Sequence, residues 1–169
     1  MPLIRPVLLA VALALATAAG TLQAAPPRIT SITCDFAAEF AKPVQPSDGE
    51  RVLLGYVGVP PRYLPQFGRD VSGRWRYGDK AGLLVHTGKK AVTIIVPQAW
   101  RRRVAINWGN SGIAGVPALR IPPCRYALSN GVWNVFTGGF WFNVRACVPL
   151  VVRVGTRSTT VRFGLGKRC

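Results

Sequence analysis

The sequence predicts an all-β fold, and more specifically an immunoglobulin-like β-sandwich stabilised by two disulfide bonds. Three observations lead to this prediction: short β-branched runs recur along the chain, glycine and proline separate them, and the number of cysteines is even. Strand-like runs spaced by roughly ten residues, with turn residues between them, are typical of a sandwich or barrel in which alternate side chains face the core.

The C-terminal tail contains the clearest strand pair. A β-branched run from Leu150 to Val154 is followed by the break Gly155-Thr156, and a second alternating run extends from Thr159 to Phe163. Period-two runs around a two-residue glycine-containing break predict a β-hairpin. Because Cys147 precedes the first run and Cys169 follows the second, we expect disulfides to fasten this hairpin into the sheet.

The first 25 residues have the pattern of a secretory signal peptide. They contain one early positive charge at Arg5, an apolar run from Val7 to Ala19, and small residues ending at Ala25. The apolar run is shorter than the roughly 20 residues of a membrane-spanning helix, and Pro26-Pro27 ends any helix there. We therefore expect one secreted or cell-envelope-associated domain, residues 26–169, without a transmembrane segment after cleavage.

The remaining chain predicts short strands joined by turns. The segment 33–42 fits a short helix or a strand, and 43–49 is expected to be a loop. The expected strands are 52–59, 71–77, 83–86, 92–96, 104–108, 118–121, 125–128, 132–136, 140–144, 150–154 and 159–163. The expected hairpin turns contain Gly88-Lys89, Asn130-Gly131, Gly138-Gly139 and Gly155-Thr156.

All four cysteines, Cys34, Cys124, Cys147 and Cys169, are predicted to be oxidised because the chain is expected to be exported. No pair has the close spacing of a zinc site. Three pairings are possible; we favour Cys34 with Cys169 and Cys124 with Cys147, which ties the domain ends together. A strict meander over 125–144 would hold Cys124 and Cys147 about 23 Å apart, beyond the roughly 7 Å limit for a bridge. Either that segment is not a meander or the pairing differs.

Charge is distributed unevenly along the chain. The formal net charge is +16, and all six acidic residues precede residue 80. Of the 22 lysines and arginines, eight precede residue 80 and the other 14 follow from Lys80 onward. The second half therefore presents a positive field, which concentrates polyanions near the surface and is screened within about 8 Å at physiological salt.

Two segments combine arginine with aromatic side chains. The predicted binding residues are Arg74, Trp75, Arg76, Trp100, Arg101, Arg102 and Arg103. Aromatic faces flanked by guanidinium groups can stack on rings while pairing with phosphates or carboxylates. The alternative is that these arginines are solvated and only protect a strand edge from aggregation. Because export argues against an intracellular nucleic acid, the expected partner is an anionic cell-wall polymer or polysaccharide.

The aromatic cluster around Gly138-Gly139 has two interpretations. Its members are Trp133, Phe136, Phe140, Trp141 and Phe142. Packing in a sandwich core is the default, with Trp141 pointing opposite to its neighbours because successive strand residues face opposite ways. A carbohydrate-stacking platform is the alternative.

No arrangement of residues predicts catalysis, a metal site or a cofactor. The segment 109–112, Gly-Asn-Ser-Gly, looks like the nucleophile loop of chymotrypsin-like proteases, but no aspartate lies between His86 and Ser111, so a turn is expected. The alternative function is an extracellular enzyme or enzyme inhibitor that uses His86. That hypothesis requires Asp70 or Asp79 within hydrogen-bond distance of the histidine ring.

Four segments carry a resemblance to a known group of proteins. They are GKKAVTIIVPQAWRRRVAINWGNS, GVWNVFTGGFWF, ACVPLVVRVG and TVRFGLGKRC. Together they resemble a family of small exported actinobacterial proteins with no assigned activity. The resemblance implies secretion, oxidised cysteines and one β domain, and it brings no catalytic or ligand-binding residues to this chain.

Overall fold

The computed structural model describes residues 25–47, 49–65, 67–69, 73–128 and 131–169. The predicted signal peptide, apart from Ala25, lies outside the described residues. Within them, the secondary structure consists of β-strands and two short 3-10 helices, η1 (Cys34–Phe36) and η2 (Gln98–Trp100). The predicted all-β fold with two disulfides is confirmed.

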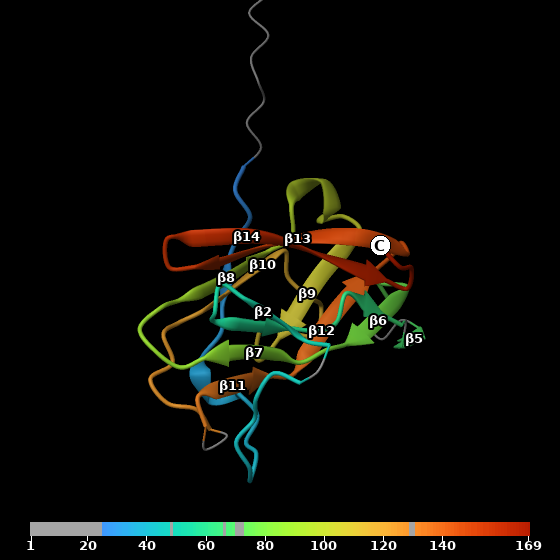
Figure 1. The fold of residues 1–169 in the computed structure, drawn as a ribbon. Helices are drawn as coiled ribbons and strands as arrows, with labels where there is room; N and C mark the ends of the chain where they lie inside the picture. The colour runs from blue at the N-terminus through green and yellow to red at the C-terminus, as the bar shows by residue number, and fades with distance from the viewer. Residues whose placement is uncertain (1–24, 48, 66, 70–72, 129–130) are drawn as a thin grey trace, which may run out of the picture.

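The largest sheet has six strands and lies along the top of Figure 1. Its centre is the predicted C-terminal hairpin, whose strands pair from Ala146↔Leu165 to Val154↔Arg157. Gly155 has φ 58°, which fits the first turn position of a two-residue hairpin loop. In spatial order the strands are β1 (Thr30–Ser31), β10 (Ala118–Ile121), β8 (Val92–Ile95), β13 (Ala146–Val154), β14 (Arg157–Leu165) and β4 (Tyr63–Leu64).

Two further sheets of four strands complete the fold. In spatial order the first contains β11 (Trp133–Phe136), β7 (Leu83–His86), β3 (Val57–Val59) and β2 (Arg51–Leu53). In spatial order the second contains β5 (Phe67–Arg69), β6 (Tyr77–Lys80), β12 (Gly138–Phe142) and β9 (Val104–Trp108). We expected one sandwich of two sheets, so the immunoglobulin-like arrangement is not confirmed by this division into three.

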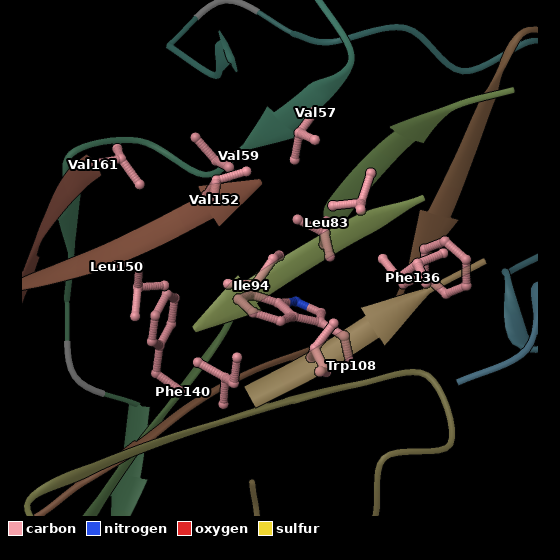
Figure 2. Packing of buried hydrophobic residues seen from close by; sticks show 14 of the residues in the cluster. Val57, Val59, Leu83, Ile94, Trp108, Phe136, Phe140, Leu150, Val152 and Val161 are labelled. Carbon is pink, nitrogen blue, oxygen red and sulfur yellow. The ribbon is translucent and has the colours of Figure 1, made fainter. Parts of the chain in front are cut away.

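One hydrophobic core joins the three sheets. Figure 2 shows Val57 and Leu83 of one four-stranded sheet, Leu150 of the six-stranded sheet, and Trp108 and Phe140 of the other four-stranded sheet directed toward one another. The indole N–H of Trp108 donates a hydrogen bond to the carbonyl of Ala81 at 2.8 Å, so the one polar group of this buried ring has a partner.

The disulfide pairing differs from the one we favoured: Cys34 is bonded to Cys124, and Cys147 to Cys169. Strands β1 and β10 pair in parallel, so the segments that follow them run in the same direction. Cys34 and Cys124 each lie three residues after their strand, and their Cα atoms are 5.7 Å apart. Cys147 pairs with Gly164, and the last residues fold back over that glycine. Cys169 therefore reaches Cys147, at a Cα separation of 4.9 Å.

The cause of this error is the segment 125–144, which is not a simple meander. Strands β11 and β12 belong to different sheets. The predicted strand 125–128 is absent from the described structure, because the buried side chain of Asn134 accepts from the Leu128 N–H and donates to the Tyr126 carbonyl. The hydrogen bonds of the Asn134 side chain thus take the place of backbone hydrogen bonds to a neighbouring strand.

Three other element predictions need correction. The run 52–59 is two strands, β2 and β3, because Leu54 and Gly55 form a turn with positive φ. Most of 71–77 is not a strand: β6 begins only at Tyr77, and 71–72 lie outside the described residues. Gly138-Gly139 begins β12 rather than forming a turn. For segment 33–42 a short helix or a strand was expected, and the segment contains η1 and an isolated bridge at Ala38.

Candidate anion-binding site

The two predicted arginine segments meet at one end of the sheet that contains β6, β12 and β9. Antiparallel pairing places Phe142 at the end of β12 between Tyr77 and Val104, which begin β6 and β9. Arg76 immediately precedes β6, and Arg103 immediately precedes β9. Segments far apart in the sequence therefore present their basic residues at the same end of the sheet.

Asn143, the first residue after β12, connects these segments. Its Oδ1 accepts a hydrogen bond from the backbone N–H of Arg76 at 2.8 Å, and its own N–H donates to the Arg103 carbonyl at 2.9 Å. Two residues later, the Cζ atom of Arg145 lies 5.2 Å from the centroid of the Tyr77 ring. We call the five basic residues of these segments the arginine surface: Arg74, Arg76, Arg102, Arg103 and Arg145.

The side chains of the arginine surface are exposed. Within the described part of the chain, the guanidinium groups of Arg76 and Arg102 have no hydrogen-bond or ion-pair partner. A hollow of about 510 Å³ is lined by Gly73, Arg74, Trp75, Arg76 and Asn143, and no described carboxylate lines it. Guanidinium groups bind phosphate and carboxylate oxygens through charge-assisted hydrogen bonds, so this edge can hold several anionic groups at once.

Trp75 supports the arginine surface from inside the protein. Its side chain is only 2% exposed, and its indole N–H donates to the Ala114 carbonyl at 2.9 Å. The Cζ atom of Arg74 lies 5.0 Å from the ring centroid. The predicted use of Trp75 as a stacking face for a ligand is therefore corrected, because burial leaves its ring inaccessible.

Trp100 and Arg101 also have structural roles. Trp100 packs partly against the core, and the Arg103 Cζ atom lies 4.4 Å from its ring centroid, which covers one face. Arg103 Nη2 donates to the Ala99 carbonyl at 3.0 Å. Arg101 is half-buried, and its Nε donates to the Val96 carbonyl at 3.1 Å. Arg101 thus stabilises its own turn, and we leave it out of the arginine surface.

Sequence reasoning missed Asn143 and Arg145 as members of this site. Asn143 follows a strand and Arg145 is a single arginine, so neither carries a local signal. Only the pairing of β12 with both β6 and β9 reveals that they lie between the two arginine-rich segments.

Replacing Asn143 by alanine is expected to loosen the arginine surface without unfolding the protein. The change removes the acceptor of the Arg76 N–H, a bond worth about 1 kcal/mol. Hydrogen exchange of the Arg76 amide should then accelerate by roughly fivefold to tenfold. Asn110→Ala is the matched control, since Asn110 Oδ1 accepts from the Thr33 N–H elsewhere. Unchanged exchange at Arg76 in Asn143→Ala would contradict the connecting role.

His86 occupies an aromatic setting. Its Nδ1 donates to the Thr87 carbonyl at 2.6 Å, and its ring centroid lies 5.6 Å from that of Tyr56 and 5.1 Å from that of Trp133. Among the described residues, no carboxylate forms a hydrogen bond with His86. Asp70, one of its two suggested partners, lies outside the described residues, and the other, Asp79, is buried on β6. The structure thus provides no observation in favour of the His86 hypothesis.

Ser111 and the aromatic cluster have structural environments. The buried Ser111 hydroxyl accepts a hydrogen bond from the Trp108 N–H at 3.1 Å, as expected of a turn residue. The core contains Phe136, Phe140 and Phe142. The ring of Trp141 lies on the opposite side of its strand, close against Gly78. The prediction that the cluster is chiefly core is confirmed.

The described residues contain no group of histidine, cysteine and carboxylate side chains arranged to hold a metal ion. They also contain no helix with the length and apolar character needed to cross a membrane. Comparisons of the chain with protein-family models, curated proteins and solved structures found no match. The functional proposal therefore depends on the chemistry of the chain itself.

Proposed function

We propose that this chain is an exported, non-enzymatic β-protein that binds anionic polymers of the cell envelope through the arginine surface. The observation that carries the proposal is the meeting of two basic segments at Asn143. This residue forms hydrogen bonds with the backbone N–H of Arg76 and the backbone carbonyl of Arg103. Several neighbouring guanidinium groups suit a repeating phosphodiester or carboxylate polymer better than a single small anion, because each added contact releases a further counterion.

The net charge of the chain supports this proposal. The formal net charge is +16, and no acidic residue follows Asp79. Long-range attraction would therefore bring a polyanion toward the protein before any contact forms. Local contacts at the arginine surface would then set its position. The tryptophans contribute by holding Arg74 and Arg103 rather than by stacking on sugar rings.

The disulfides support export. Two disulfide bonds and the absence of free cysteines among the described residues suit an oxidising compartment. The signal peptide over residues 1–25, the resemblance to exported actinobacterial proteins and the immunoglobulin-like class are parts of the same proposal. For the fold class, support comes from the packing of β3 and β7 against β8 and β13 in one core.

The test is retention of the exported chain on isolated cell-wall material as salt increases. We expect the triple variant Arg74→Gln, Arg76→Gln, Arg102→Gln to elute at lower salt than the wild type. The slope of log affinity against log salt should fall by about 2 to 3, since each phosphate contact contributes about 0.7 to 0.9. Far-ultraviolet circular dichroism of both proteins should be the same, because all three side chains are exposed.

The matched control removes the same charge elsewhere. Arg120, Arg153 and Arg157 are exposed on the six-stranded sheet, so their triple glutamine variant lowers the net charge equally. The proposal expects this control to keep nearly the wild-type slope. Equal loss in both variants would mean that only net charge matters, and undiminished retention on wall material stripped of its anionic polymers would rule out the proposed partner.

A further inference from the structure

A second basic site, with no residue in common with the arginine surface, lies in a cleft between two strand edges. Strand β2 is the outermost strand of its sheet, and β14 pairs with β4 only at Gly164 and Leu165. The edge 160–162 of β14 is therefore without a strand partner on that side among the described residues. The cleft has a volume of about 550 Å³ and is lined by Arg51, Val52, Leu53, Arg62, Thr160, Val161, Arg162 and Cys169.

Arg51 is held at this cleft by one hydrogen bond and one ring contact. Its Nη2 donates to the Arg162 carbonyl at 3.2 Å, so the side chain occupies the open edge of β14 in place of a neighbouring strand. Its Cζ lies 5.1 Å from the centroid of the Phe163 ring. The Nε–H group is buried and has no acceptor among the described residues. A guanidinium group fixed in this way loses little further entropy when it binds an anion.

Positive charge in the cleft is not balanced by its lining. Arg62 and Arg162 are exposed at its rim, and no carboxylate side chain of a described residue lines it. Burial, and next the positive charge of Arg62, lower the pKa of Arg51 from its ordinary value. An anion placed between these arginines would offset both effects, because an opposite charge nearby favours the charged form of Arg51.

Part of the remaining lining is apolar. Val52 and Leu53 are aliphatic, and Val52 is 47% exposed, so apolar surface is accessible beside the arginines. Val161 also borders the cleft, but its side chain belongs to the core. The volume of the cleft is far greater than that of a single oxyanion, for which a liquid water molecule at about 30 Å³ gives the scale. The lining therefore suits a ligand with one anionic end and one hydrocarbon part.

We propose that this cleft binds an amphipathic oxyanion, a carboxylate or phosphate ester attached to an aliphatic chain, with Arg51 and Arg62 on the anionic group and Val52 and Leu53 on the chain. The site shares no residue with the arginine surface, so either site can fail without the other.

Calorimetric titration with octyl phosphate, octanoate, 1-octanol and inorganic phosphate tests this site. Binding of octyl phosphate or octanoate, with 1-octanol and inorganic phosphate at least tenfold weaker, supports it. Whether the ester or the carboxylate binds more tightly identifies the source of the anionic group. Failure of both amphiphiles to bind, or equal binding by 1-octanol or inorganic phosphate, overturns the proposal.

Two variants locate the binding. Arg62→Gln removes an exposed guanidinium group and is expected to weaken octyl phosphate binding about tenfold, the equivalent of one charge-assisted hydrogen bond. Arg51→Gln should weaken it further, although it also removes the bond to the Arg162 carbonyl. Arg157→Gln, at the far turn of the same hairpin, is the control and should bind as the wild type does. An Arg62→Gln variant with unchanged affinity places the ligand elsewhere and sinks the proposal.

Discussion

Replacing Cys34 and Cys124 together by serine is expected to lower the free energy of unfolding by about 4 to 5 kcal/mol. The two cysteines are 90 residues apart in the sequence, so their bond removes more conformational freedom from the unfolded chain than a short loop would. A domain of this size is stable by about 5 to 15 kcal/mol, so the loss is a large part of the total. Chemical denaturation at equilibrium measures it.

The Cys147→Ser, Cys169→Ser variant provides the comparison. Its loop spans 22 residues, which predicts a smaller loss of about 3 kcal/mol. The β13–β14 hairpin would still be held by its backbone ladder. If the two double variants were equally destabilised, or if the order were reversed, the loop-length argument would be wrong. Peptide mapping without reduction should recover the pairs Cys34–Cys124 and Cys147–Cys169.

Gly139→Ala is expected to destabilise the protein by about 3 kcal/mol or more, through overpacking combined with backbone strain. Gly139 has φ 156°, and an added Cβ atom would overlap the backbone carbonyl of Asp79 on the neighbouring strand. Strand β12 would have to move away from β6, which breaks the pairing that brings Asn143 next to Arg76. Thermal unfolding followed by circular dichroism measures the loss.

Gly112→Ala separates the two causes of this effect. Gly112 has φ 96°, but an added Cβ atom there would meet no atom within 4 Å. Backbone strain alone should cost about 1 to 2 kcal/mol. The difference between the variants is the cost of the close approach of β12 to β6. A Gly139→Ala protein as stable as Gly112→Ala would mean that the strands are farther apart than the structure indicates.

Local sequence patterns predicted the strands well where side-chain alternation and turn residues determine the structure. The β13–β14 hairpin followed from side-chain alternation and from the turn chemistry of Gly155. Gly138-Gly139 misled the same reasoning, because glycine serves both tight turns and close contacts between backbones. Here the neighbouring strands leave no room for a Cβ atom, and that crowding depends on pairings distant in the sequence.

Long-range pairing explains the other errors. The disulfide connectivity depends on the parallel contact of β1 with β10 and on the fold-back over Gly164, neither of which has a local signature. The arginine segments were recognisable from composition, but the direction of their tryptophans was not. Trp75 is adjacent to two exposed arginines and yet is buried, because Ala114 provides an acceptor for its indole N–H. The cleft beside Arg51 arises only where two sheet edges approach.

The most direct test of the proposed function is a nuclear magnetic resonance titration of the arginine side chains with a short phosphodiester oligomer from a wall polymer. The account predicts that the Nε–H signals of the arginine surface, Arg74, Arg76, Arg102, Arg103 and Arg145, shift together and saturate at one ligand concentration. Signals of Arg120, Arg153 and Arg157 should remain in place. Shifts spread evenly over both sets, or confined to the second, would contradict a single binding surface organised around Asn143.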